Sequence, residues 1–384
     1  MNRKRLQKRW FLAFVGMSIT WLLCCCTKPP PDEEAWPSWS PDSQWLVYEC
    51  YRKGPVDARG FIDRLAEPNG DLTFYKPEAA DLCISEVGSG VESRVVTNAG
   101  GDWRPSWSPD GTHIAYLRQD GIYLTTPTGK KSERVSEIRP PFSFLEQELV
   151  WSPTGDRLLF SACPDYGDFD VYSLEIESGV LRNLTSSRRT DDFSPEWTFG
   201  GTQVVYLSVD DISSWYGTDI PPVLEIRTLK ADGTGDWLVY AREHYYDPYR
   251  DITVANSGYI WYAHQSLFRL DVAGGTLTKE LSPIIENIHM PLVAPNEQYL
   301  LYYYRQANKI QMLNIQTGEV SKLTDKSLLD QGVALLPRTW APDSEKFAAM
   351  AIMDVDFWEH NVRNIYIFNL QDRILQPLVT QNGD

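Results

Sequence analysis

Residues 104–116 read Arg-Pro-Ser-Trp-Ser-Pro-Asp-Gly-Thr-His-Ile-Ala-Tyr, and this stretch decides the fold because the chain repeats it. Pro109 fixes φ for a tight turn, and Gly111 suits the left-handed backbone that closes such a turn. A strand of alternating polar and apolar residues follows from Thr112 onward. The stretch therefore predicts two antiparallel strands joined by a short turn.

The same pattern recurs along the whole chain. The copies centre on Pro41, Pro109, Pro153, Phe199, Ala255, Pro295 and Pro342, and the one at Ala255 is the most eroded. A third strand and a Gly-containing turn into a fourth strand follow most copies. Units of four short strands are typical of β-propeller blades, which bury their faces only by stacking in a ring. We expect an all-β, seven-bladed propeller of four-stranded antiparallel blades, or six blades if the copy at Ala255 is not one.

The Trp-Ser-Pro-Asp-Gly repeat resembles that of TolB-type propellers, a WD40-like family, over about residues 36–380. This resemblance implies a ring used as a binding platform, with residues 36–384 as its domain. We expect no α/β domain ahead of the ring, no hydrolase domain after it and no strand exchanged between the first and last blades. A Gly-x-Ser-x-Gly nucleophile elbow is absent from the sequence.

The N-terminal segment has the pattern of an export signal. Arg3, Lys4, Arg5, Lys8 and Arg9 precede an uncharged, mostly apolar run over residues 10–26, as in a secretory signal. The run ends in Leu-Leu-Cys-Cys-Cys, which resembles a bacterial lipobox and implies a lipid anchor at Cys25 or Cys26, although no Ala, Gly or Ser precedes these cysteines. An uncleaved membrane helix is the alternative, since 17 residues is the lower limit for a span. We expect residues 1–26 to be a signal or anchor and the Pro-rich, acidic residues 27–35 a tether.

Charge and cysteine content bear on the protein's partners and on its cellular compartment. The formal net charge of −16 opposes binding to nucleic acid. Export permits disulfides, and Cys50 and Cys83 fall on neighbouring predicted strands, so they are candidates for a bridge. Cys163 is expected to be a free, buried thiol.

Catalytic and metal-binding patterns are weak in the sequence. The five histidines include no pair with metal-ligand spacing, although His244 and His289 precede first strands of adjacent predicted blades. We therefore predict no catalytic residue, no metal and no cofactor. Oligogalacturonide lyases resemble this repeat class and gather metal ligands at the propeller axis, so a lyase remains the enzymatic alternative.

The long connections carry the strongest binding signal. Those between second and third strands and those between blades all emerge on one face of a propeller, and the long segments of this chain are of these two kinds. Four aromatic residues on them are our candidate ligand contacts: Trp215, Tyr245, Tyr249 and Trp358. Insertions whose aromatics pack locally are the competing interpretation.

These features predict a non-catalytic module that binds a protein or glycan. We expect a monomeric propeller of the bacterial cell envelope, exported and held at a membrane by its N-terminal lipid or helix, on the periplasmic or cell-surface side. The alternatives are a metal-assisted polysaccharide lyase of the oligogalacturonide type and a structural subunit of an envelope assembly.

Overall fold

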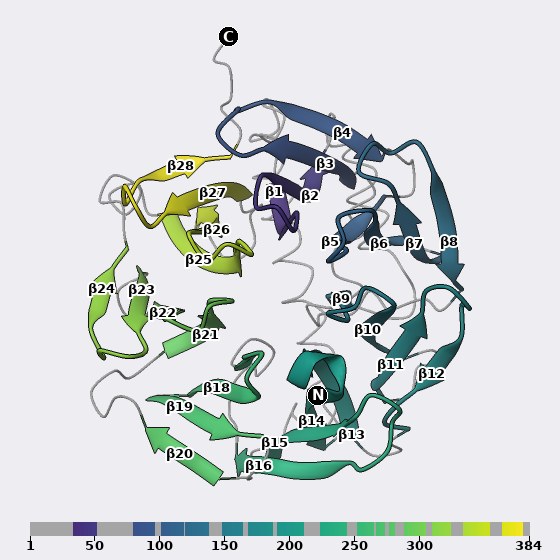
Figure 1. Ribbon diagram of the computed structural model, residues 1–384, viewed down its shortest axis with the longest axis vertical. Coiled ribbons are helices and arrows are strands. Elements are labelled where there is room, and N and C mark those ends of the chain that lie inside the picture. Colours follow the sequence, from purple (N-terminus) through teal and green to yellow (C-terminus); the bar gives the residue numbers. More distant parts are fainter. Residues whose placement is uncertain are drawn as a thin grey trace, which may run out of the picture. The chain divides into compact units, whose positions relative to one another are not determined.

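The computed structural model describes seven β-sheets, all within one compact unit. The described residues are 34–51, 80–96, 101–118, 120–137, 148–163, 168–186, 190–210, 223–243, 252–264, 266–272, 276–280, 288–304, 309–323, 333–353 and 363–378. The sheets follow one another around a ring (Figure 1). The predicted seven-bladed propeller is confirmed.

Each blade consists of four strands that are consecutive in sequence and antiparallel to their neighbours. The first three blades are β1 (Glu34–Trp39), β2 (Trp45–Tyr51), β3 (Ala80–Glu86) and β4 (Glu92–Val96); β5 (Trp103–Trp107), β6 (Ile114–Arg118), β7 (Gly121–Thr125) and β8 (Ser132–Ser136); and β9 (Val150–Trp151), β10 (Arg157–Ala162), β11 (Asp170–Glu175) and β12 (Leu181–Asn183).

The remaining blades repeat the same order. They are β13 (Thr190–Thr198), β14 (Gln203–Asp210), β15 (Val223–Lys230) and β16 (Trp237–Glu243); β17 (Ile252–Val254), β18 (Tyr259–His264), β19 (Ser266–Asp271) and β20 (Thr276–Glu280); β21 (Ile288–Val293), β22 (Tyr299–Tyr304), β23 (Lys309–Asn314) and β24 (Val320–Lys322); and β25 (Val333–Trp340), β26 (Lys346–Met353), β27 (Arg363–Asn369) and β28 (Leu375–Pro377). The eroded copy at Ala255 is thus a complete blade.

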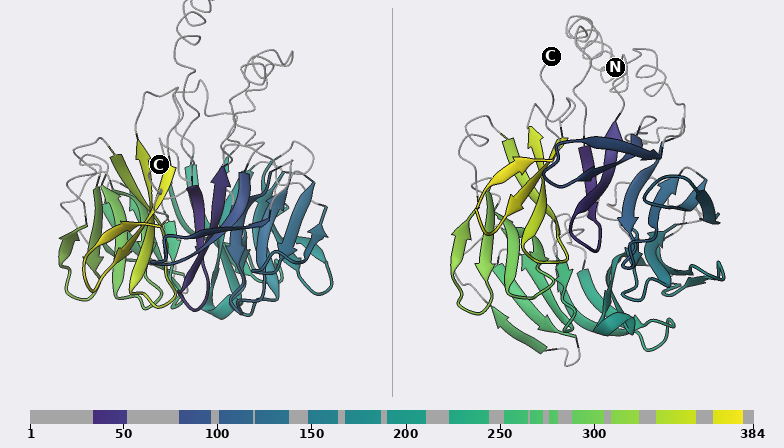
Figure 2. Two further views of the ribbon diagram at one scale, coloured as in Figure 1. Left: turned by 90° about the horizontal axis from the view of Figure 1, so that it is seen from above. Right: turned by 45° about the horizontal axis from the view of Figure 1, so that its top comes forward.

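Strand order gives the ring an inside and two faces. In Figure 1 the first strand of a blade lies nearest the ring centre and the fourth lies at the rim. Edge-on, in Figure 2, the strands run side by side between two faces. We name the turn face after the short turns between first and second strands, at 40–44, 108–113, 152–156, 199–202, 255–258, 294–298 and 341–345. The loop face is the opposite one, where second strands end and third strands begin.

Side chains of the repeated motif build the turn themselves. The Ser108 hydroxyl donates to Asp110 Oδ1 at 2.6 Å, and the same carboxylate accepts from the Thr112 backbone N–H. These bonds hold the pKa of Asp110 below its usual value, with the Ser108 bond as the largest cause. Asp42 and Ser40 repeat the arrangement in blade 1. The side chains of the motif thus provide hydrogen-bond partners for backbone groups of the turn that are not paired between strands.

Motif tryptophans pack toward the preceding blade in five of the seven described blades. They are buried, and in four of the described blades the indole N–H donates to a carbonyl on the preceding blade's first strand: Trp39 to Thr339 at 3.3 Å, Trp151 to Ser106 at 3.0 Å, Trp197 to Val150 at 3.2 Å and Trp340 to Leu292 at 2.9 Å. We call this contact the tryptophan latch. It combines burial of a large ring with a satisfied polar group.

A second set of contacts links the turns around the turn face. Gly111 has φ of 73°, and a Cβ there would lie 3.1 Å from Pro41 Cγ of the preceding blade, so both the backbone and the tight packing favour glycine. In the last blade the equivalent left-handed position is Ser344, whose hydroxyl instead accepts the Asn296 backbone N–H at 3.1 Å. Either solution packs one turn against its neighbour.

The ring closes by side-chain packing between blades 7 and 1. The Ser43 hydroxyl accepts the Asp343 backbone N–H at 3.1 Å, which repeats the turn contact across the two ends of the ring. Trp39 and Leu46 share a core cluster with Ile365 of blade 7. Every blade keeps its own four strands, so the prediction that no strand is exchanged is confirmed.

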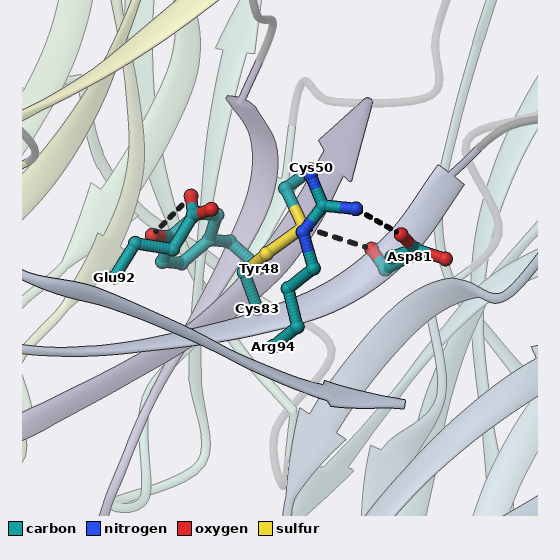
Figure 3. Close-up of a disulfide and its surroundings, with 6 residues drawn as sticks. All are labelled: Tyr48, Cys50, Asp81, Cys83, Glu92 and Arg94. Carbon is teal, nitrogen blue, oxygen red and sulfur yellow. Dashed lines mark hydrogen bonds and ion pairs between the residues drawn. A yellow bond between two sulfur atoms is a disulfide. The ribbon is translucent and has the colours of Figure 1, made fainter. Parts of the chain in front are cut away.

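Cys50 and Cys83 form a disulfide between β2 and β3, with Cα atoms 5.8 Å apart (Figure 3). Both cysteines are buried. The nearby Arg94 guanidinium pairs with Asp81 at 2.8 Å. Cys163, the other cysteine in the described part of the chain, lies outside this disulfide and is half-buried instead of fully buried as predicted. Within the described residues, no helix is long and apolar enough for a membrane span.

Candidate functional site on the innermost strands

The innermost strands carry repeated β-bulges. Strand pairing shifts between Ala35 and Ser38 in β1 and between Trp103 and Ser106 in β5, and similar shifts occur in β13 and β21. At each bulge a residue followed by proline has left-handed φ: Trp36 at 55°, Arg104 at 54°, Ser194 at 50° and Met290 at 54°. Non-glycine residues rarely adopt this conformation, which costs on the order of 1–3 kcal/mol. Bulges redirect side chains, and these lie around the ring axis.

Bulges on the innermost strands of three blades bring an aromatic ring and two cations together. The Arg104 Cζ atom lies 3.2 Å from the centroid of the Trp36 ring, and Arg338 Cζ of the last blade lies 4.6 Å from it. The indole of blade 1 therefore lies against guanidiniums from both neighbouring blades. Such cation–π contacts each contribute roughly 0.5–2 kcal/mol.

A buried carboxylate fixes the position of Arg104. Glu49 on β2 is 2% exposed, and its Oε1 accepts the Arg104 backbone N–H at 2.8 Å. This bond satisfies an N–H that the bulge removes from the ladder between β5 and β6. A charge-assisted bond in a buried setting is among the stronger hydrogen bonds, so it compensates the strained backbone of Arg104.

Two glutamates follow on blades 3 and 4. Glu148 lies two residues before β9, and Glu196 is on β13. Burial raises the pKa of the Glu196 carboxyl to about 8, and the Glu148 charge adds to the rise. Desolvation by the surrounding protein raises the pKa of the Glu148 carboxyl, while the charges of Arg104 and Arg338 oppose this rise. With its pKa near 8, the Glu196 carboxyl retains a proton near neutral pH.

We call Trp36, Arg104, Glu148, Glu196 and Arg338 the axial cluster. In ring order it runs from a cation on blade 7 through an indole and a second cation to two acids on blades 3 and 4. Glu148 is exposed to solvent and the other four members are half-buried. Guanidiniums bind carboxylates and phosphates, and a protonated carboxyl donates to hydroxyl or carbonyl oxygens. The cluster can therefore hold an acidic ligand that also carries neutral polar groups.

The residues predicted as binding or lipid-anchoring lie outside the described residues. These are Cys25, Cys26, Trp215, Tyr245, Tyr249 and Trp358. The strands on either side of the last four are described: Trp215 falls between β14 and β15, Tyr245 and Tyr249 fall between β16 and β17, and Trp358 falls between β26 and β27. Those strand ends belong to the loop face.

One histidine lies elsewhere than predicted. His289 lies within β21 instead of preceding it. In the described part of the chain, the group of His, Cys, Asp and Glu side chains with metal-ligand spacing is Cys50, Cys83 and Glu92. Its two sulfur atoms are joined in the disulfide, so they are not thiolate ligands.

Sequence reasoning missed the axial cluster, although a signal was present. Trp36, Arg104 and Glu148 each stand three residues before the motif tryptophan of their blade. Aligning the repeats on that tryptophan places these three residues at one level of the ring. Charged and aromatic residues at one level of neighbouring innermost strands would have indicated a shared site.

The fold and the axial cluster together define a seven-bladed β-propeller with a polar site on its innermost strands. No protein-family model matches the chain. Among curated proteins, it is 23% identical over 169 residues to dipeptidyl-peptidase 5 of Porphyromonas gingivalis, and 25% identical over 218 residues to an uncharacterized protein of Agrobacterium fabrum. These alignments cover 41% and 53% of this chain but only 22% and 60% of the two relatives.

Solved structures show the same fold in proteins of different activity. A puromycin hydrolase superposes with a TM-score of 0.63 at 12% identity, covering 92% of this chain and 55% of its own. An oligogalacturonate lyase from Vibrio parahaemolyticus gives 0.59 at 10% identity, covering 88% and 91%. TolB from Acinetobacter baumannii is also among the similar structures, with a TM-score of 0.46 at 15% identity, covering 88% and 77%. At these identities the likeness is one of fold.

Proposed function

We propose that this chain is an exported, membrane-tethered propeller that binds a protein or glycan of the bacterial cell envelope without catalysis. The axial cluster carries the proposal. Its two arginines and two glutamates converge from four blades on one solvent-accessible place, where strained backbone is maintained around Arg104. Strain that persists on a rigid scaffold is a mark of functional sites.

The chemistry of the cluster indicates the ligand class. Arginine binds carboxylates through paired hydrogen bonds, and Trp36 offers an apolar surface for a sugar ring or a peptide side chain. A carboxylate-bearing ligand fits these groups, such as an acidic glycan or the C-terminus of a polypeptide. The predicted loop contacts Trp215, Tyr245, Tyr249 and Trp358 would extend such a site outward from the axis.

Export and anchoring have separate support. The disulfide between Cys50 and Cys83 favours an oxidising compartment, because cytosolic thiols are kept reduced. The basic N-terminus, the apolar run and the cysteines at its end favour a lipid anchor at Cys25 or Cys26. Together they support a place on the periplasmic or cell-surface side of a membrane.

The proposal is tested by comparing arginine variants. Residues 27–384 would be screened against acidic and neutral glycans, and against peptides with free or amidated C-termini. We expect binding only to carboxylate-bearing probes, and at least tenfold weaker binding in Arg104→Gln and Arg338→Gln. Arg134→Gln is the matched control, since Arg134 is 41% exposed on the outermost strand of blade 2. Affinity equal to that of wild type in all three variants, with unchanged melting temperatures, would refute the role of the axial cluster.

A metal-assisted polysaccharide lyase is the second candidate function. The superposition with an oligogalacturonate lyase solved with manganese covers 91% of the lyase, so the two chains share nearly the whole of the lyase fold. The test is release of unsaturated uronate products from oligogalacturonides with added manganese. Turnover of the oligogalacturonide would contradict the non-catalytic proposal and establish the lyase. Recovery of the protein in a stable envelope complex, with no soluble ligand, would favour a structural subunit.

A further inference from the structure

The motif tryptophan is missing from two successive blades, and a cavity lies at that place. Where the other blades have tryptophan, blades 5 and 6 have Val254 and Val293. Both valines are half-buried, whereas the five motif tryptophans are buried. A cavity of about 240 Å³ lies beside them, at the ends of the innermost strands of blades 5, 6 and 7.

The cavity has the composition of a site for a planar apolar group. It is lined by Val254, Ala255, Leu292, Val293, Thr339 and Trp340, with Asn256 and Pro295 at its exposed edge. An apolar cavity of about 150 Å³ is large enough for benzene. The larger cavity here has room for a two-ring system, and the buried Trp340 provides an aromatic wall.

The repeat itself shows which group fits. At the junction of blades 6 and 7, the Trp340 ring lies between the blades and its N–H donates to Leu292 O at 2.9 Å. One junction earlier, Val293 is the counterpart of Trp340 and Thr253 is the counterpart of Leu292. The Thr253 hydroxyl already accepts the Val293 backbone N–H at 3.4 Å, which shows that the two strands adjoin here as elsewhere. A backbone carbonyl has two lone pairs, so Thr253 O can accept an indole N–H while it is paired within the sheet.

We propose that this cavity, the vacant latch, binds the indole of a tryptophan side chain from a partner polypeptide. The indole would occupy the place that the motif tryptophan fills in other blades and would donate to Thr253 O. The site lies at the turn-face ends of the innermost strands and includes no residue of the axial cluster, so it stands or falls independently of the proposed function.

The first test uses N-acetyl-L-tryptophanamide as the probe and N-acetyl-L-leucinamide as the control. With the methyl groups of valine labelled, NMR titration should show saturable shifts of Val254 and Val293 with the tryptophan probe only. This measurement needs no variant, so it does not depend on the folding of one. Shifts that are equal for both probes, or absent up to the solubility limit of the tryptophan probe, would overturn the proposal.

The second test fills the cavity. Val293→Trp supplies the missing latch from within the chain, so it should raise the melting temperature and weaken probe binding at least tenfold. Val91→Trp is the matched control, because Val91 is 65% exposed on the first blade and far from the cavity in sequence. A folded Val293→Trp variant that binds the probe as tightly as wild type would contradict the proposal.

Discussion

Replacing Cys50 and Cys83 by alanine should destabilise the propeller by an amount that the structure determines. The two cysteines are 33 residues apart, and closing a loop of this length removes about 3.7 kcal/mol of chain entropy from the unfolded state. Unfolding entropy of roughly 2.1 cal/mol/K per residue over about 350 residues converts this loss into a melting temperature about 5 °C lower. Both side chains are buried, so the alanines also leave space in the core of blade 1.

The assay is thermal or urea denaturation of residues 27–384, with and without reductant. Wild type should approach the double variant once reduced, and the double variant should not respond to reductant. Alkylation of the unfolded, unreduced protein should label one cysteine, Cys163. Labelling of three cysteines, together with a midpoint that reductant leaves unchanged, would refute the bridge.

Three further predictions concern the ring, a buried acid and the anchor. Ending the chain after Thr324 removes β25 to β28 and exposes the apolar faces of blades 6 and 1, so the truncated protein should lose its cooperative melting; a monomer with a sharp, native-like transition would show that blade 7 is dispensable. Burial raises the pKa of Asp192 to about 6, so between about pH 4 and 6 the folded state keeps a proton that the unfolded chain releases, and stability should fall by at most about 3 kcal/mol across this range. Asp192→Asn should remove that fall in urea titrations. Equal dependence of stability on pH in wild type and variant would contradict the assignment. Palmitate labelling in a bacterial host should disappear when Cys24, Cys25 and Cys26 are all changed to serine, and an unlabelled wild type with an intact N-terminus would establish an uncleaved anchor instead.

The fold was predictable because the repeated turn combines residues with little conformational choice. Proline restricts φ, and the following glycine position requires a left-handed backbone. Even the eroded copy at Ala255 keeps Gly258, whose φ is 88°. The turn therefore remained recognisable where the tryptophan was lost, and the seven blades could be counted from the turns.

The axial cluster was less predictable because it depends on bulges. The repeats place Trp36 and Arg104 at one level of the ring, but strict alternation does not give the side to which they point, since one extra residue reverses it. Only the fold brings Arg338 of the last blade beside Trp36 of the first. Long-range pairs of this kind have no local sequence signal.

The structure determines which residues of the turn face can serve as controls in binding experiments. Asp110 and Thr154 fall in solvent-facing turns by sequence alone. Their side chains in fact hold the turns, through Ser108 to Asp110 at 2.6 Å and Thr154 to Asp156 at 2.5 Å. Replacing either would disturb the fold. Glu319 remains suitable, because its exposed side chain lies in the turn between β23 and β24.

The measurement that tests the central claim most directly is ligand affinity after loss of the four loop aromatics. With a carboxylate-bearing ligand in hand, changing Trp215, Tyr245, Tyr249 and Trp358 to alanine one at a time should weaken binding by about 1–4 kcal/mol each. The melting temperature should hardly change, and Glu319→Ala should bind like wild type. Lost binding in Glu319→Ala, with all four aromatic variants neutral, would contradict a binding site on the loop face.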